Sequence, residues 1–264
     1  MSAERRVAIV TGAARGIGAA TVSALLAQGW AVLALDIARD VEALPYSLAT
    51  QDDLASAIVS ASSGQAATFV ADVRDPQALQ AAVAEAERRW GGLDAAIACA
   101  GAIAGGVPQW ELPPAAEQAL VDINLGGVLN LARAAVPALL RRPQPRSGRF
   151  VAVASAAATE GLDKLAAYCA SKAGVTGLVR GLAAELGPTG VTVNAVSPGS
   201  TRTAMLDESA RMYALDDAEA FARQQPLQRI IEPDEVAAVI AFLAGEASAA
   251  VTGAVVPVDG GFAL

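Results

Sequence analysis

The stretch from Val7 to Gly18, Val-Ala-Ile-Val-Thr-Gly-Ala-Ala-Arg-Gly-Ile-Gly, constrains the fold more than any other part of the chain. Its four opening apolar residues favour a buried parallel strand, and an Ala- and Leu-rich helix follows the glycines. Glycine tolerates the backbone angles of a tight turn, and its missing Cβ lets a pyrophosphate reach the amide groups at a helix N-terminus. The spacing Gly12-x-x-x-Gly16-x-Gly18 therefore predicts a dinucleotide-binding turn, although an ordinary strand-to-helix turn can carry the same glycines.

Strand and helix patterns alternate along the whole chain. The predicted strands are Val7–Val10, Ala31–Leu35, Ala67–Val70, Ala95–Ala98, Phe150–Ala154, Thr192–Ser197 and Ala254–Val258. The predicted helices are Gly16–Gln28, Gln51–Ser62, Pro76–Trp90, Ala115–Leu140, Leu165–Leu186 and Pro233–Ala244. This alternation predicts an α/β fold, a Rossmann-like doubly wound parallel sheet of seven strands with helices on both faces. We expect one domain over residues 1–264, with a substrate lid at about 200–231.

Composition excludes several classes of protein. A net charge of −8 and scattered Lys and Arg argue against nucleic acid as a ligand. We find neither a signal peptide nor an uninterrupted apolar stretch of membrane-spanning length, so we expect no membrane partner. The two cysteines suggest no disulfide framework, and we expect a cytoplasmic protein. Because the chain has no histidine, His-dependent triads and most zinc sites are excluded, and we expect no metal.

An acidic side chain ends the second predicted strand. Asp36 follows Gly18 by eighteen residues, where a carboxylate accepts hydrogen bonds from both ribose hydroxyls of an adenosine and repels the extra phosphate of NADP. Asp36 therefore favours NAD as cofactor. Arg15 and Arg39 lie close enough in sequence to offset that repulsion, so NADP stays open as an alternative.

The ends of the third and fourth predicted strands also suit a nucleotide. Asp72 can accept a hydrogen bond from an adenine amine, and Val73 can supply an apolar contact. Ala100 and Gly101 are small residues placed where a backbone must approach a flat ligand, although simple packing also explains them.

Tyr168 and Lys172 are four residues apart on a predicted helix and therefore share one face. A nearby cation favours the phenolate, so we expect the Lys172 ammonium, helped by the positive ring of an oxidised nicotinamide, to bring the pKa of Tyr168 from about 10 to about 7, which suits a general base. Ser155 ends the fifth predicted strand, on the edge where open α/β sheets bind ligands, and can hold a substrate oxygen. Asn124 is a poor helix former in mid-helix, which suggests a role such as holding a water.

Over almost its full length the chain resembles the short-chain dehydrogenase/reductase family. Thr11-Gly-Ala-Ala-Arg-Gly-Ile-Gly18 resembles the family's cofactor loop, and this implies cofactor contacts from Gly12, Arg15, Gly16, Ile17 and Gly18. The resemblance further implies an adenine contact at Asp72 and Val73, and cofactor contacts at Asp36, Ala100, Gly101, Tyr168 and Lys172. Pro198-Gly199, followed by Thr203, resembles the family's segment at the nicotinamide carboxamide, which implies cofactor contacts at Pro198, Gly199 and Thr203. The resemblance also implies a catalytic tetrad of Asn124, Ser155, Tyr168 and Lys172. One departure is that the family's Asn-Asn-Ala-Gly reads Ala98-Cys99-Ala100-Gly101 here, so the hydrogen bonds of the first Asn must be replaced or lost.

The segment Leu44-Pro-Tyr-Ser-Leu-Ala-Thr-Gln-Asp-Asp-Leu54 and the ending Pro257–Leu264 resemble the mycofactocin-coupled subgroup of this family. This implies a tightly held NAD that does not exchange and a peptide-derived redox partner, mycofactocin. A surface loop of variable length is the alternative. The family resemblance also implies a homotetramer.

These observations predict an oxidoreductase that interconverts a secondary alcohol and a ketone by hydride transfer with NAD. The apolar residues of 200–231 favour a neutral, apolar alcohol or ketone, although packing of the lid onto the core also explains them. We expect the acidic residues of that segment to face water or to repel anionic substrates. Two alternatives remain: an NADP-dependent 3-oxoacyl thioester reductase, and a nucleotide-sensing protein without turnover.

Overall fold

The computed structural model describes residues 5–264; residues 1–4, at the start of the predicted domain, lie outside the described part. Its strands are β1 (Val7–Thr11), β2 (Ala31–Asp36), β3 (Ala66–Val70), β4 (Ala95–Ala98), β5 (Arg149–Val153), β6 (Thr192–Pro198) and β7 (Val255–Val258). Its α-helices are α1 (Gly16–Ala27), α2 (Gln51–Ser56), α3 (Pro76–Trp90), α4 (Pro114–Val121), α5 (Gly127–Arg141), α6 (Ala166–Leu186), α7 (Ala204–Met212) and α8 (Pro233–Ala244).

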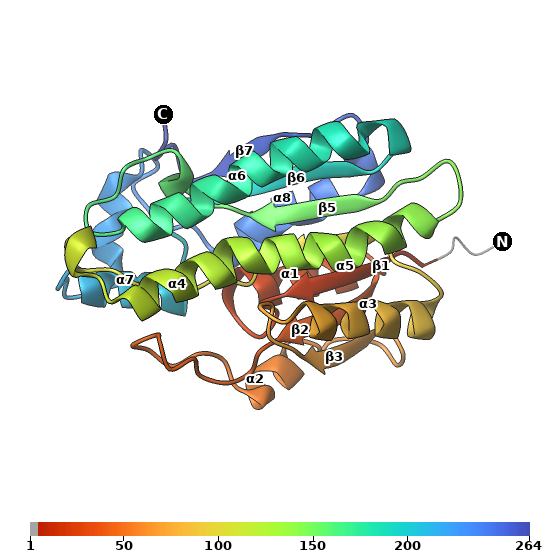
Figure 1. Ribbon diagram of the computed structural model, residues 1–264, viewed down its shortest axis with the longest axis horizontal. Helices are drawn as coiled ribbons and strands as arrows, with labels where there is room; N and C mark the ends of the chain where they lie inside the picture. The colour runs from red at the N-terminus through yellow and green to blue at the C-terminus, as the bar shows by residue number, and fades with distance from the viewer. Residues whose placement is uncertain (1–4) are drawn as a thin grey trace.

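All seven strands form one parallel sheet in the order β3-β2-β1-β4-β5-β6-β7. The strand order reverses between β1 and β4, and ligands bind at such a reversal, beyond the carboxyl ends of the strands. Figure 1 shows α4 and α5 crossing in front of the sheet, and α7 beside the end opposite the N-terminus. The predicted Rossmann-like sheet with helices around it is confirmed.

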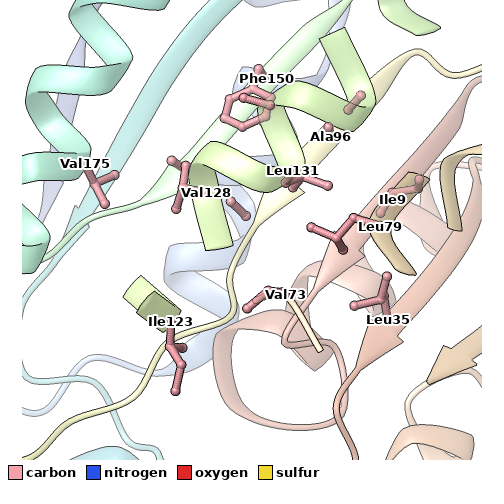
Figure 2. Close-up of a cluster of buried hydrophobic side chains, with 14 of the residues drawn as sticks. Ile9, Leu35, Val73, Leu79, Ala96, Ile123, Val128, Leu131, Phe150 and Val175 are labelled. Atoms are coloured by element: carbon pink, nitrogen blue, oxygen red, sulfur yellow. The ribbon is translucent and has the colours of Figure 1, made fainter. Parts of the chain in front are cut away.

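Each face of the sheet has its own apolar core. On one face, α3, α5 and α6 pack on the strands; Figure 2 shows Ile9, Leu79, Leu131, Phe150 and Val175 from that cluster. On the other face α1 and α8 supply the partners. Because both faces are covered, the strands are apolar at nearly every position.

Two predicted helices differ from the structure. The helix predicted over Gln51–Ser62 ends at Ser56, and Ile58, Val59 and Ser60 follow in tight turns because β-branched residues and serine favour a helix poorly. The helix predicted over Ala115–Leu140 is continuous but contains a π-helical turn, Asp122–Gly126, in which Gly127 N donates to Asp122 O. Among the described residues, this run, Pro114–Arg141, has the length and composition of a membrane span, and 56% of its most apolar window is buried in the protein.

Candidate functional site

The glycine turn between β1 and α1 opens a pocket of about 520 Å³ at the strand-order reversal. Gly12 and Gly16 have positive φ angles of +65° and +56°, which glycine adopts without strain. A Cβ on Gly12 would lie 2.7 Å from Ala100 Cα, and one on Gly18 would lie 1.9 Å from Gly12 O. Helix α1 starts here, and no side chain of the described residues caps its first amides. Such a turn with free amide donors fits the pyrophosphate of a dinucleotide.

Asp36, at the end of β2, lies on the pocket wall and is 8% exposed. Its Oδ2 accepts from Ala14 N (3.1 Å) and its Oδ1 accepts from Ala38 N (3.1 Å). Each carboxylate oxygen keeps a second lone pair for a ligand hydroxyl. Asp36 therefore ties the glycine turn to β2 and still presents acceptors to the pocket.

Asp72 and Val73 also line the pocket, where adenine is expected. Burial alone would raise the pKa of the Asp72 carboxyl, but hydrogen bonds from Arg74 outweigh burial and lower it. Arg74 donates from Nε and Nη2 to the two carboxylate oxygens, the latter at 2.6 Å. Asp72 is thus held ionised by its neighbour.

Thr11 holds the backbone of the segment Ala98-Cys99-Ala100-Gly101, which departs from the family's Asn-Asn-Ala-Gly. Its hydroxyl accepts from Ala100 N (3.2 Å), so the backbone after β4 stays held to β1. Cys99 lines the pocket and is half-buried, and desolvation raises the pKa of its thiol to about 12. Cys99 therefore stays protonated and is not a nucleophile at neutral pH.

Ser155, Tyr168 and Lys172 all line the same pocket. Ser155 follows β5, and its Oγ accepts from Ala157 N (3.2 Å). Tyr168 and Lys172 lie near the start of α6 and are 7% and 3% exposed. Lys172 Nζ donates to Val153 O (2.9 Å).

The chain's own groups do not give Tyr168 the pKa of about 7 that is expected with the oxidised nicotinamide beside it. Burial raises the pKa of Tyr168 to about 12, and a hydrogen bond with Ser155 offsets only part of that rise. Burial also lowers the pKa of Lys172 to about 8, because desolvation disfavours its ammonium. Among the chain's own groups, the Lys172 ammonium, which donates to the Val153 carbonyl, does not offset the effect of burial on the pKa of Tyr168.

Asn124 lies in the π-helical turn and is fully buried. Its Oδ1 accepts from Ala102 N (2.8 Å), and its Nδ2 donates to Ala102 O (3.0 Å) and to Ser171 Oγ (3.0 Å). The side chain thus joins the loop after β4 to α6, and Asn124 is not among the described residues that line the pocket. A water held by Asn124 stays a prediction.

The loop after β6 and the predicted lid form the remaining wall. Pro198, Gly199 and Thr203 line the pocket, and Thr203 also caps α7. The lid holds α7 and a 3₁₀ turn, Ala218–Gln224. Its pocket-lining residues are Ala204, Met205, Leu206, Ser209, Tyr213, Leu215, Phe221 and Gln224. The sulfur of Met205 lies 4.0 Å from the Tyr168 hydroxyl.

One expectation about the lid is wrong. Glu208 does not face water but is 6% exposed and pairs with Arg211 (2.5 Å). The other acidic residues of the lid, Asp207, Asp216, Asp217 and Glu219, are exposed as expected.

Sequence reasoning assigned no role to Tyr46, which the structure places in the pocket wall. Tyr46 belongs to residues 37–50, between β2 and α2, which we call the strap. Its hydroxyl accepts from Ile103 N (3.0 Å) across the pocket, and Ser47 O accepts from Arg15 (3.2 Å). The strap thus contacts both the loop after β4 and the glycine turn. Phe262, near the C-terminus, was missed as well.

Comparison with known proteins agrees with this geometry. Residues 12–263 match the family model described as enoyl-(acyl carrier protein) reductase. Cis-4-hydroxycyclohexanecarboxylate dehydrogenase of Sinomonas cyclohexanicum is 38% identical, with 97% of this chain and 96% of the relative covered. The chain belongs to the short-chain dehydrogenase/reductase family. D-threitol dehydrogenase of Mycolicibacterium smegmatis is 36% identical, with 98% of this chain and 93% of that protein covered. The crystal structure of carveol dehydrogenase from Mycobacterium avium in complex with NAD matches with a TM-score of 0.89 and 31% identity, over 97% of each chain.

Proposed function

We propose that this protein is an NAD-dependent dehydrogenase that interconverts a neutral, apolar secondary alcohol and its ketone. The observation that carries the proposal is that Ser155, Tyr168 and Lys172 line the same pocket as the glycine turn. NAD, when bound, accepts a hydride from the alcohol carbon, and its oxidised ring adds a positive charge at the reacting end of the site.

Tyr168 is the proposed general acid and base. Its phenolate takes the proton of the alcohol as the ketone forms, and the resulting phenol returns that proton in the reverse reaction. For this the pKa of Tyr168 must fall from about 12, which requires cationic charge close to its oxygen. Lys172, with a pKa of about 8, is largely protonated at neutral pH and supplies part of that charge. The hydroxyl of Ser155 holds the substrate oxygen, Lys172 also anchors the ribose, and Asn124 holds a relay water.

Asp36 supports NAD over NADP. Its carboxylate lies on the pocket wall with acceptors available for the ribose hydroxyls of NAD. The extra phosphate of NADP would be repelled by the negative charge of this carboxylate. Arg15, which could offset that charge, donates to the strap. Arg39 is exposed and is not among the described residues that line the pocket.

The lid supports a neutral, apolar substrate. Leu162, Leu165, Met205, Phe221 and Phe262 are apolar residues that line the pocket. Glu208, the buried acid of α7, is neutralised by Arg211, while the exposed acids of the lid repel anions. Carboxylates and phosphorylated substrates are therefore disfavoured.

The strap supports slow release of the nucleotide. Tyr46 and Ser47 join it to both sides of the pocket, so a bound dinucleotide leaves only after these contacts open. A cofactor that does not exchange needs a second electron carrier, and a peptide-derived carrier such as mycofactocin is the partner we propose.

We further propose a homotetramer in the cytoplasm. Val121 on α4, Leu129 on α5 and Phe242 on α8 are apolar side chains 39%, 41% and 48% exposed, and subunit contacts on these helices would cover them. Cys99 and Cys169 are free thiols, which suits a reducing compartment.

The test starts with the purified protein and no added nucleotide. Denaturation and mass spectrometry identify any bound NAD or NADH, and turnover is then measured on neutral cycloalkanols with added NAD or with an artificial electron-accepting dye. We expect ketone formation that Tyr168→Phe lowers by about 10²–10⁴-fold without loss of nucleotide binding. Unchanged turnover in Tyr168→Phe, or activity restricted to 3-oxoacyl thioesters with NADPH, would contradict the proposal.

A further inference from the structure

A buried glutamine joins the lid to the loop after β6. Gln225 follows the 3₁₀ turn of the lid and is 0% exposed. Its Oε1 accepts from Ser200 N (2.8 Å), and its Nε2 donates to Arg229 O (2.5 Å). Both ends of the side-chain amide are therefore used to bridge two backbone segments.

The surroundings of Gln225 are built from glycines. A Cβ on Gly199 would lie 2.4 Å from Gln225 Oε1, and a Cβ on Gly260 would lie 3.2 Å from Gln225 Cβ. Gly199 N donates to Val258 O (3.1 Å), which ties the loop after β6 to the end of β7. Gln225 thus lies where the lid, the loop after β6 and the C-terminal turn meet.

The chemistry of this position requires an amide. Ser200 N presents a donor and Arg229 O an acceptor to the same buried side chain, so the residue between them must both accept and donate. An apolar side chain would leave both backbone groups unsatisfied, and a carboxylate would satisfy only Ser200 N.

We propose that Gln225 is a positioning residue for the reaction, which fixes the backbone at Ser200 and thereby holds the nicotinamide end of the cofactor against the lid. Pro198, Gly199 and Ser200 line the pocket, and on the other side Ser200 O accepts from Ile231 N (3.0 Å). Residue 200 is therefore held by Gln225 and Ile231, both from the segment that ends the lid. The proposal rests on the proposed function, because it takes the loop after β6 as the place of the nicotinamide.

The test compares Gln225→Met, which keeps the length of the side chain, with wild type and with Gln80→Met on the exposed face of α3 as matched control. Release of NAD and of ADP-ribose, which lacks the nicotinamide, is measured by chasing the loaded protein with excess nucleotide. We expect Gln225→Met to release NAD about tenfold faster and to lower kcat about tenfold, with ADP-ribose release unchanged. The proposal would be overturned if Gln225→Met released NAD and ADP-ribose faster by the same factor. It would also be overturned if both the rate of NAD release and kcat stayed at their wild-type values.

Gln225→Glu provides a second test that does not depend on the folding of the Met variant. A protonated glutamic acid accepts from Ser200 N and donates its hydroxyl to Arg229 O, whereas the carboxylate repels that carbonyl. The charged side chains of the adjoining segments are engaged elsewhere, since Asp259 accepts from Gly261 N and Ala263 N, and Arg229 pairs with Glu235.

We therefore expect the kcat of Gln225→Glu, relative to wild type, to recover as pH falls from about 8 to about 5.5. A ratio that does not change with pH would overturn the proposal. If the wild-type enzyme oxidised no secondary alcohol, the proposed function would fail, but the comparison of NAD with ADP-ribose release would still decide the role of Gln225.

Discussion

Replacing Tyr46 by Phe tests whether the strap controls release of the nucleotide. The substitution keeps the ring in the pocket wall and removes only the hydroxyl that accepts from Ile103 N (3.0 Å). Ile103 is 3% exposed, so its amide is left without an acceptor and with little access to water. Burial raises the pKa of Tyr46, so the hydroxyl is intact at neutral pH in the wild-type protein.

The expected size of the effect follows from that contact. Leaving one buried amide unsatisfied destabilises the closed strap by about 1–3 kcal/mol. The population of the open strap, and with it the rate of nucleotide release, should therefore be about 5–150-fold higher. The Arg15 contact to Ser47 O is at the surface and contributes less. Both NAD and ADP-ribose should leave faster, because the strap holds the whole nucleotide.

The assay loads the protein with NADH, chases it with excess NAD and follows the loss of bound NADH fluorescence. The matched control is Tyr213→Phe in the lid, which also removes a tyrosine hydroxyl hydrogen-bonded to the backbone, in this case one that donates to Asp163 O. If Tyr46→Phe released NADH at the wild-type rate, or if both variants released it faster by the same factor, the strap would not control release of the nucleotide.

Three further predictions concern Asp36, Lys172 and Asn124. Asp36→Ala should lower the preference for NAD over NADP by about tenfold or more, measured as the ratio of the two kcat/KM values, since a repelling charge and ligand acceptors are lost. Burial lowers the pKa of Lys172 from 10.5 to about 8, so between these values the unfolded chain binds more protons than the folded one, and the free energy of unfolding gains a contribution that rises with pH. When the free energy of unfolding in urea is plotted against pH, the wild-type value should rise relative to that of Lys172→Met from about pH 8 to about pH 10. Two parallel plots would contradict the burial of the charge. Asn124→Ala should destabilise the fold by about 2–5 kcal/mol, because the amide and carbonyl of Ala102 lose their partner, and thermal unfolding would detect it; a variant as stable as wild type would mean that another group replaces these bonds.

Much of the fold was predictable because it follows from local patterns. A parallel strand covered on both faces is an unbroken apolar run, and a glycine turn before a helix is unmistakable when it follows such a run. Element ends were less predictable. The π-helical turn at Asp122–Gly126 leaves the apolar periodicity nearly intact, so the sequence suggested an ordinary helix there. Only the poor helix propensity of Asn124 indicated that the segment was unusual.

The sequence by itself determined which chemical groups this protein has and where they stand along the chain: Asp36 at the end of β2, Ser155 after β5, and Tyr168 one helical turn before Lys172. Tertiary structure decided their environment. It buried Tyr168, and burial raises the pKa of its hydroxyl to about 12, so the value near 7 that the sequence suggested depends on the positive charge of the cofactor. It also brought Tyr46 to Ile103 and Gln225 to Ser200, pairs 57 and 25 residues apart. Desolvation and long-range hydrogen bonds depend on what packs around a residue, and no local pattern records that.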